Sequence, residues 1–344
     1  MQQTRRRISW TISAAALACA LALAPAYASA EVVASPTEAT AAATAAPDAT
    51  AAATKPKFTL STGNTYPYRG RRYVLPRTQI RIDGSVAADL DDQIVKVVIK
   101  KRGRTVKTDS VRLTARGGKS SFSTRFRAGK KGKFIATVEL TDEQKALVSE
   151  GDGTAVNVVR TNIHRGSSGV AVRLFQSKLA KLKYVVPVNG RFDAATGRAF
   201  MAFRKNNFLK RNETAGSSVA RKLAAGKGGF KMRRKGNERR IEVSIKRQVM
   251  ALIDNGKVQR IYTVSTGAPA TPTIRGRYHV YRKDWGTNQK GMVHSSYFIR
   301  GYAVHGYASV PPYNASHGCV RVPVPNAASI FNWIKMGTRV DTYY

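Results

Sequence analysis

One cysteine in the last third of the chain stands among residues that suit nucleophilic catalysis. Cys319 lies in the stretch Ser316-His317-Gly318-Cys319-Val320-Arg321, and His305-Gly306 comes before it. A free thiol has a pKa of about 8.5 and is mostly protonated near neutrality, so an imidazole must take its proton or stabilise the thiolate. A returning strand or loop can bring His305 beside Cys319, and we expect His305 to be the base.

The neighbouring residues suggest further roles. His317 is the weaker candidate for the base, because side chains two positions apart in an extended segment share a face but lie about 6 to 7 Å apart. Gly318 lets the backbone approach a substrate and turn amide N–H groups toward a developing oxyanion. Zinc is the alternative for His294, His305, His317 and Cys319. Their spacing fits no standard finger, and a zinc-bound thiolate is not a free nucleophile, so we expect no metal.

These residues resemble the signature of L,D-transpeptidases of the YkuD type, His-Gly followed by Ser-x-Gly-Cys-[Ile/Val]-Arg. The stretch before them is also similar to that family, with Val264-Ser265-Thr266-Gly267, Thr271-Pro272 and Gly276-Arg277-Tyr278. Thr273-Ile274-Arg275 is longer than the single residue usual at that point. The resemblance covers about residues 240 to 340 and implies a β-rich catalytic domain.

The resemblance implies a role for each matching residue. Cys319 is the nucleophile and His305 the base and later acid, with the Gly306 carbonyl orienting the imidazole. His317, Gly318 and Cys319 supply backbone amides to an oxyanion hole, and Ser316 holds the loop by hydrogen bonds. Arg321 supports the site or meets a substrate carboxylate.

The implied reaction is an acyl transfer without a cofactor. Cys319 attacks the third residue of a peptidoglycan tetrapeptide stem, expels terminal D-Ala and forms a thioester. An amine of a neighbouring stem then gives a 3→3 cross-link, or water gives an L,D-carboxypeptidase. Tyr297, Phe298 and Tyr278 are expected to wall the substrate groove, the alternative being that they belong to the core or rim.

The chain begins with features of an export signal. Arg5-Arg6-Arg7 precedes the apolar run Ile12 to Leu23, and Ala28-Ser29-Ala30 supplies a cleavage pattern. About 12 apolar residues are too few to span a bilayer, so we expect an exported protein with no integral membrane segment after cleavage, sent by the general or the twin-arginine route. Cleavage removes Cys19 and leaves Cys319 without a disulfide partner.

The 344-residue chain carries a strongly positive net charge. Lys and Arg number 59 against 20 Asp and Glu, a formal net charge of +39. Such a charge favours polyanions, and an exported chain meets anionic lipid and anionic wall polymers first. We therefore expect peptidoglycan stem peptides and glycan as partners, anionic wall polymers in addition, and no nucleic acid, since no base-reading motif accompanies the charge.

The remaining segments predict three folded parts. Period-2 alternation at Val95, Val97 and Ile99, and again at Phe122 to Phe126, Phe134 to Val138 and Val156 to Val158, predicts an all-β, Ig-like sandwich. Helical periodicity at Val172, Phe175, Leu179 and Leu182, an Asp193 cap and a weak third helix near Val219 to Leu223 predict three helices. With Gly169 to Gln176 and Gly190-Arg191-Phe192-Asp193, this part resembles the peptidoglycan-binding domain of wall enzymes, although Arg204 replaces the usual Gln.

The expected organisation is multidomain. The expected boundaries are 1–30 for the signal peptide, 31–57 for an Ala/Thr-rich linker, 58–162 for the sandwich, 163–226 for the helical domain, 227–239 for a basic linker and 240–344 for the catalytic domain. Asp254-Asn255-Gly256 predicts a hairpin in the last of these. The competing hypothesis is a cationic wall-binding protein whose catalytic-looking domain is inactive.

Overall fold

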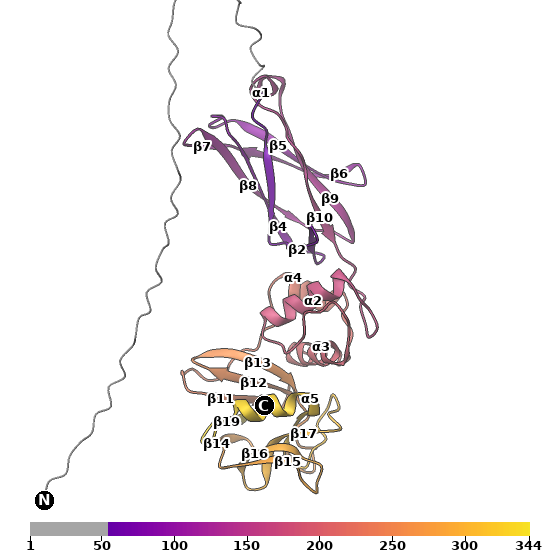
Figure 1. Cartoon of the computed structure of the whole chain (residues 1–344), viewed down its shortest axis with the longest axis vertical. Helices are drawn as coiled ribbons and strands as arrows, with labels where there is room; N and C mark the ends of the chain where they lie inside the picture. The colour runs from indigo at the N-terminus through magenta and orange to yellow at the C-terminus, as the bar shows by residue number, and fades with distance from the viewer. Residues whose placement is uncertain (1–53) are drawn as a thin grey trace, which may run out of the picture. The chain divides into compact units, whose positions relative to one another are not determined.

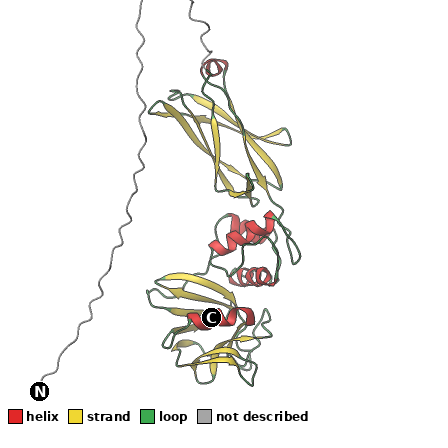
Figure 2. Ribbon diagram, in the orientation of Figure 1, coloured by secondary structure: helices red, strands yellow, loops and turns green. Residues whose placement is uncertain are grey.

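The computed structural model describes residues 54–344, which form one compact unit. The predicted signal peptide and most of the predicted linker lie outside the described residues. The described chain is multidomain and consists of an N-terminal β-sheet region, a helical segment and a C-terminal β-rich region (Figure 1). Figure 2 shows the change from strands to helices and back to strands along the chain.

Two sheets enclose the core of the N-terminal region. Its elements are β1 (Thr59–Gly63), β2 (Tyr66–Tyr68), β3 (Arg71–Val74), β4 (Gln79–Val86), β5 (Ile94–Lys101), β6 (Arg104–Arg112), β7 (Thr114–Arg116), β8 (Lys119–Arg127), β9 (Gly132–Glu139), α1 (Asp142–Leu147) and β10 (Thr154–Val158). A four-stranded sheet has the order β1-β4-β8-β7, and a six-stranded sheet has the order β2-β3-β10-β9-β5-β6. Ile82 and Phe122 from the first sheet share one buried cluster with Val97 and Val138 from the second. The alternating residues of these strands therefore meet between two sheets, as in a sandwich.

Three helices follow: α2 (Val170–Lys181), α3 (Ala194–Asn206) and α4 (Ser217–Ala224). Asp193 caps α3 as predicted, because its Oδ1 accepts the Thr196 N–H at 2.7 Å. Arg204 is 6% exposed and donates to the carbonyl oxygens of Lys210, Thr214 and Ala215, at 3.1, 2.8 and 3.1 Å. The guanidinium thus organises the turn between α3 and α4.

The C-terminal region is built on two further sheets. Its strands are β11 (Arg240–Ser244), β12 (Val249–Asp254), β13 (Lys257–Thr263), β14 (Gly276–His279), β15 (Arg282–Thr287), β16 (Val293–Ile299), β17 (Tyr302–Tyr307), β18 (Val320–Pro323) and β19 (Arg339–Tyr343), with the helix α5 (Val324–Trp333). The five-stranded sheet has the order β13-β12-β11-β19-β14, and the four-stranded sheet has the order β15-β16-β17-β18. Helix α5 packs on β16 and β17 (Figure 1).

The hairpin predicted at Asp254-Asn255-Gly256 is confirmed. Strands β12 and β13 pair antiparallel across it, and Asn255 and Gly256 have φ values of 49° and 66°. Two positive φ values in a two-residue loop define a type I′ turn, which matches the twist of the flanking strands.

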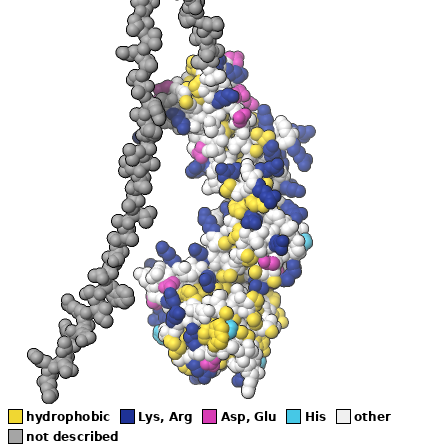
Figure 3. Space-filling view, in the orientation of Figure 1, with side chains coloured by type: hydrophobic (Ala, Val, Ile, Leu, Met, Phe, Trp, Pro, Cys, Tyr) yellow, Lys and Arg dark blue, Asp and Glu magenta, His cyan; other side chains and the backbone are white. Residues whose placement is uncertain are grey.

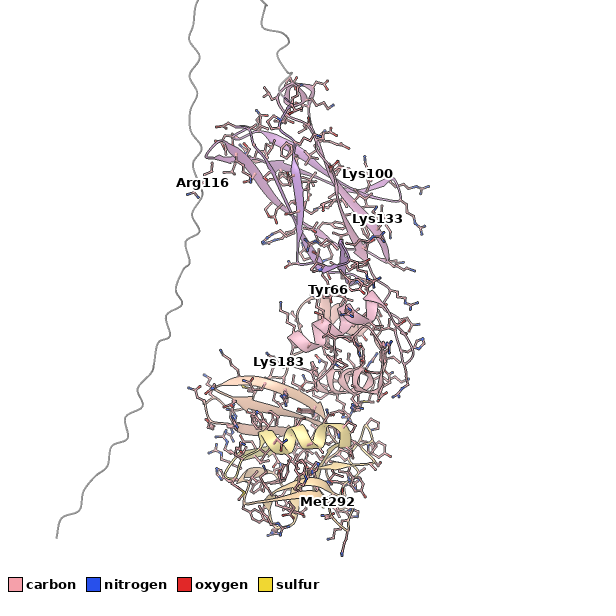
Figure 4. The ribbon with its side chains drawn as sticks, viewed as in Figure 1. Tyr66, Lys100, Arg116, Lys133, Lys183 and Met292 are labelled. Atoms are coloured by element: carbon pink, nitrogen blue, oxygen red, sulfur yellow. The ribbon has the colours of Figure 1, made fainter. Side chains whose placement is uncertain are left out.

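The five-stranded sheet is covered on both faces. Val249, Ala251 and Ile253 belong to the cluster formed with the three helices, whereas Met250 and Leu252 belong to the cluster beneath α5. A backbone hydrogen bond also joins the two regions at Lys183, labelled in Figure 4, whose carbonyl oxygen accepts the Ile261 N–H at 2.8 Å. The helical segment and the five-stranded sheet consequently share one apolar core.

Among the charged side chains on the surface that Figure 3 shows, basic ones are widespread and acidic ones are few. Within residues 54–344, no helix is both long enough and apolar enough to cross a bilayer.

Candidate active site

Two neighbouring parallel strands bring Cys319 and His305 together. Strand β17 pairs with β18 in the register Val304 to Val320 and His305 to Arg321. Cys319 directly precedes β18, so it stands beside Ala303, two positions from His305 on the partner strand. Alternate residues of a strand project to the same face, which places the thiol, the imidazole and the Arg321 side chain on one face of the sheet.

The thiol of Cys319 lies in a largely apolar corner. The Ala303 N–H donates to Sγ at 3.4 Å, and Sγ lies 3.8 Å from the Gly301 carbonyl oxygen. Cys319 also packs against a cluster of Met292, Tyr297 and Ala303, of which Met292 is labelled in Figure 4. Burial raises the pKa of the thiol, against the smaller opposing effects of the Ala303 N–H and two nearby cations. The resting nucleophile is therefore a protonated thiol.

His305 is held as a neutral base. It is 3% exposed, and its Nδ1 lies 2.9 Å from the Gly306 carbonyl oxygen. Since a carbonyl can only accept, Nδ1 carries the hydrogen and Nε2 keeps its lone pair. Burial lowers the pKa of His305, and the charge of Arg321 lowers it further, while the Gly306 carbonyl acts in the opposite direction. At neutral pH the pair is a thiol and an imidazole, and the proton must move during the attack.

Ser316 holds the turn that leads to Cys319. It is 1% exposed; its Oγ donates to the Cys319 carbonyl oxygen at 2.6 Å and accepts the Gly318 N–H at 3.1 Å. This corrects one expectation, because the amide of Gly318 is already engaged by Ser316 and is not directed at a substrate. An oxyanion hole would have to use the amides of His317 and Cys319.

Gly318 is required for a steric reason. Its φ of +108° is strained for an L residue, and an added Cβ would lie 1.9 Å from Cε1 of Tyr302. Tyr302 begins β17, and its ring fills the space over the glycine. Sequence reasoning missed Tyr302, and the motif offered no signal for this contact.

A second loop braces the same turn and was also missed. The Thr273 hydroxyl donates to the Gly318 carbonyl oxygen at 2.8 Å and accepts the Gly267 N–H at 2.9 Å. The Thr271 hydroxyl donates to the Ser316 carbonyl oxygen at 3.0 Å. Thr271 belongs to the Thr271-Pro272 pair that carried the family resemblance, which was the available signal, whereas Thr273 opens the stretch in which the chain departs from the family.

Arg321 and His317 border the site. The guanidinium of Arg321 lies 4.2 Å from the ring centroid of Tyr307, and that ring meets His305 edge-on at 5.8 Å. The aromatic ring thus holds the cation near the imidazole. The side chain of His317 is exposed.

The three candidate substrate aromatics lie in different places. Tyr297 belongs to the cluster that contacts Cys319 and is 5% exposed. Phe298 is instead part of the core of the domain, where its ring meets that of Tyr278 at 5.8 Å. The expectation that Phe298 walls a groove is therefore wrong, because consecutive strand residues point to opposite faces and Phe298 points inward. Tyr278 is only partly buried and stays a predicted groove residue.

Within the described chain, no three His, Cys, Asp or Glu side chains lie close enough to hold a metal ion. His294, once considered with Cys319 as a zinc ligand, stacks on Trp285 at 3.8 Å and accepts the Gly286 N–H at 3.1 Å through Nδ1.

Comparison with known proteins identifies the C-terminal region. Residues 238–341 match the model of the L,D-transpeptidase catalytic domain, YkuD. The solved L,D-transpeptidase from Xylanimonas cellulosilytica is 31% identical, with 54% of this chain and 98% of that chain covered and a TM-score of 0.49. The catalytic domain of the Enterococcus faecium L,D-transpeptidase acylated by ertapenem is 25% identical, with 32% of this chain and 100% of that chain covered and a TM-score of 0.27. An L,D-transpeptidase from Mycobacterium tuberculosis is 10% identical, with 83% and 98% covered and a TM-score of 0.29. No curated protein matches the chain.

Proposed function

The chain belongs to the L,D-transpeptidase family, and from that premise we propose that it forms 3→3 cross-links in peptidoglycan through a thioester on Cys319. One observation carries the proposal. A free thiol lies on the same sheet face as a buried imidazole whose Nδ1 is fixed by the Gly306 carbonyl, so that Nε2 is left as the proton acceptor.

The first acyl transfer uses that pair directly. Sγ attacks the carbonyl carbon of the third stem residue while its proton passes to Nε2 of His305. The C–N bond to the terminal D-Ala then breaks, and the imidazolium gives its proton to the departing amine. A neutral resting pair suits this sequence, because His305 begins as a base and ends the step having acted as an acid.

The second transfer repeats the same chemistry with another nucleophile. An amine of a neighbouring stem attacks the thioester carbonyl, its proton passes to His305, and the C–S bond breaks to return the thiol. With water as acceptor the same steps give an L,D-carboxypeptidase.

The surrounding groups receive supporting roles. We assign oxyanion stabilisation to the amides of His317 and Cys319, and assign to Arg321 the binding of a substrate carboxylate, since its guanidinium is positioned by Tyr307 beside the imidazole. Tyr297 forms one wall of the acyl pocket. Neither transfer needs a group other than these side chains and backbone amides.

The other modules would hold the enzyme at the wall. We propose that the chain is exported by its N-terminal signal, that residues 163–226 bind glycan, and that residues 58–162 act as a cationic spacer or a further wall-binding module. Residues 31–57 and 227–239 then serve as linkers. The alternative of a wall-binding protein with an inactive catalytic domain predicts the same localisation without an acyl-enzyme.

Intact-mass spectrometry separates these two possibilities. The protein is incubated with a disaccharide tetrapeptide or with ertapenem, beside Cys319→Ala and Ser329→Ala, a control that changes an exposed hydroxyl on α5. We expect the parent and the control to gain one acyl adduct and Cys319→Ala to gain none. A folded parent with a titratable thiol and no adduct on either compound would establish the inactive alternative.

A further inference from the structure

A hollow lined by arginines lies on the catalytic region, among residues separate from the cysteine site. Its volume is about 810 Å³, and it is bordered by the segment 233–234, the loop and strand 274–277 and the end of the chain at 341–344. Arg233, Arg234, Arg275 and Arg277 line it together with Tyr343 and Tyr344. Neither Cys319 nor His305 borders this hollow.

A smaller hollow of about 360 Å³ continues it. The two share Arg233, Tyr343 and Tyr344, and the smaller one adds Lys231, Lys246 and Arg247 to the lining. Positive side chains therefore follow a surface path longer than either hollow. A ligand that occupies both must carry more than one anionic group.

Aromatic rings hold several of these cations in place. The guanidinium of Arg233 lies 4.8 Å from the ring centroid of Tyr343, and that of Arg275 lies 4.8 Å from the ring centroid of Tyr344. Arg247 lies 5.2 Å from the ring centroid of Phe208. Stacking leaves the N–H edges of a guanidinium available, so these groups can still donate to a ligand.

The backbone beneath Arg233 and Arg234 is also fixed. The carboxylate of Glu242, which is fully buried, accepts the N–H of Arg233 at 2.7 Å and that of Arg234 at 3.2 Å. The same carboxylate is paired with Arg240 at 3.1 Å, so it is engaged on the inner side of the segment. The two exposed guanidinium groups are thus presented from an anchored backbone.

The cations of the larger hollow are poorly balanced by acids. Asp341 is the acidic side chain in its lining, and Arg339 contacts its Oδ2 at 2.9 Å while Arg277 lies 3.7 Å from its Oδ1. Among the salt bridges of residues 54–344, none involves Arg233, Arg234 or Arg275. Like charges held together without a counterion repel one another, and a bound polyanion would relieve that repulsion.

We propose that this pair of hollows, the arginine hollow, binds a linear phosphodiester polymer. Guanidinium forks recognise both carboxylate and phosphate. A carboxylate is planar and is matched by a single guanidinium, and Asp341 accepts two N–H groups from Arg339 on its Oδ2. The non-bridging oxygens of a phosphodiester lie out of plane around phosphorus and can accept from the two separate segments that present Arg233 and Arg275. The repeating charge of such a polymer matches the path through both hollows.

Binding of poly(glycerol phosphate) by the full chain tests this inference without using the transfer reaction. The variant replaces Arg233, Arg234 and Arg275 by Gln, and the control replaces Lys257, Arg260 and Lys335 by Gln, which are exposed on the catalytic region and border neither hollow, so both lose the same charge. We expect the hollow variant to bind at least about tenfold more weakly, with a shallower salt dependence, and the control to change by less than about threefold.

Further arms identify the ligand. Poly-glutamate of equal charge, inorganic phosphate and vesicles with anionic or neutral phospholipid are measured on the same proteins, and ertapenem adduct formation confirms that the hollow variant is folded. Weaker binding of poly-glutamate than of poly(glycerol phosphate) supports the phosphodiester assignment. Equal losses in the two triple variants would reduce the effect to net charge, and preference for poly-glutamate, or binding to vesicles alone, would also overturn the inference.

Discussion

Lys205 joins the helical segment to the catalytic region and makes the stability of their shared core depend on pH. It lies in α3 and is 1% exposed, and its Nζ donates to the Thr263 hydroxyl and to the Val264 carbonyl oxygen, both at 2.8 Å. Burial lowers its pKa to about 7, and the nearby charge of Arg211 contributes in the same direction. A neutral amine has two N–H groups, which match the two acceptors.

The size of the effect follows from proton linkage. An unfolded lysine has a pKa of about 10.4, so between about pH 7 and 10 the unfolded chain binds one proton more than the folded chain. The folded chain is therefore most stable above the pKa of the unfolded lysine, where the amine is neutral in both states. That stability is lost as the pH falls toward the pKa of Lys205 in the folded chain. The slope is at most about 1.4 kcal/mol per pH unit, or about 2 kcal/mol between pH 8 and 9.5. Lys205→Met removes the titration, and its loss of two hydrogen bonds does not vary with pH.

Urea unfolding followed by tryptophan fluorescence measures the difference. Trp285 and Trp333 both belong to the catalytic region and report its unfolding. We expect the free energy of unfolding of the parent, relative to Lys205→Met, to rise by about 2 kcal/mol from pH 8 to 9.5. The exposed Lys227→Met should follow the parent at every pH. Parallel curves for the parent and Lys205→Met would refute the argument that burial keeps this amine neutral.

Two further predictions concern the reaction. Ser316→Ala removes the bonds to the Cys319 carbonyl and the Gly318 N–H, and we expect acylation by ertapenem to slow by about 10- to 100-fold with about 1 to 3 kcal/mol lower stability. A rate within twofold of the parent, measured by stopped-flow or timed mass spectrometry, would show that these bonds do not position the nucleophile. The acylation rate of the parent should rise with pH through the pKa of His305, and because burial lowers that pKa the midpoint of the rise should lie below about pH 6.5, the ordinary value of an imidazole. A rise centred above pH 7 would contradict a neutral resting imidazole.

Local signals in the sequence were sufficient for much of the fold. Asn255-Gly256 required two positive φ values and predicted the β12–β13 hairpin, and Asp193 supplied the cap of α3. The burial of both faces of β12 was not predicted. It depends on the helices, which are distant in sequence, and alternation alone predicts one buried face.

In the candidate site, too, the local motifs were predictable and the contacts between distant segments were not. The His-Gly and Ser-x-Gly-Cys segments identified the two residues that the β17–β18 pair brings together. The contact of Tyr302 with Gly318 joins residues from different segments and left no pattern to detect. Tyr297 and Phe298 are 5% and 3% exposed, so hydrophobicity could not reveal which of them faces the thiol. Only the register of the strand decides that.

The apolar core shared by the helices and the catalytic sheet bears on where the protein can be divided. The segment 238–341 that matches the family starts after α4, yet Val249, Ala251, Ile253 and Ile261 bury their side chains among the three helices. A fragment cut at that boundary would expose an apolar stripe along a sheet and lose the lysine that caps the end of β13. In this chain the smallest piece with a closed surface therefore begins before α2, and transfer of its catalytic sheet to another protein would have to carry these helices with it.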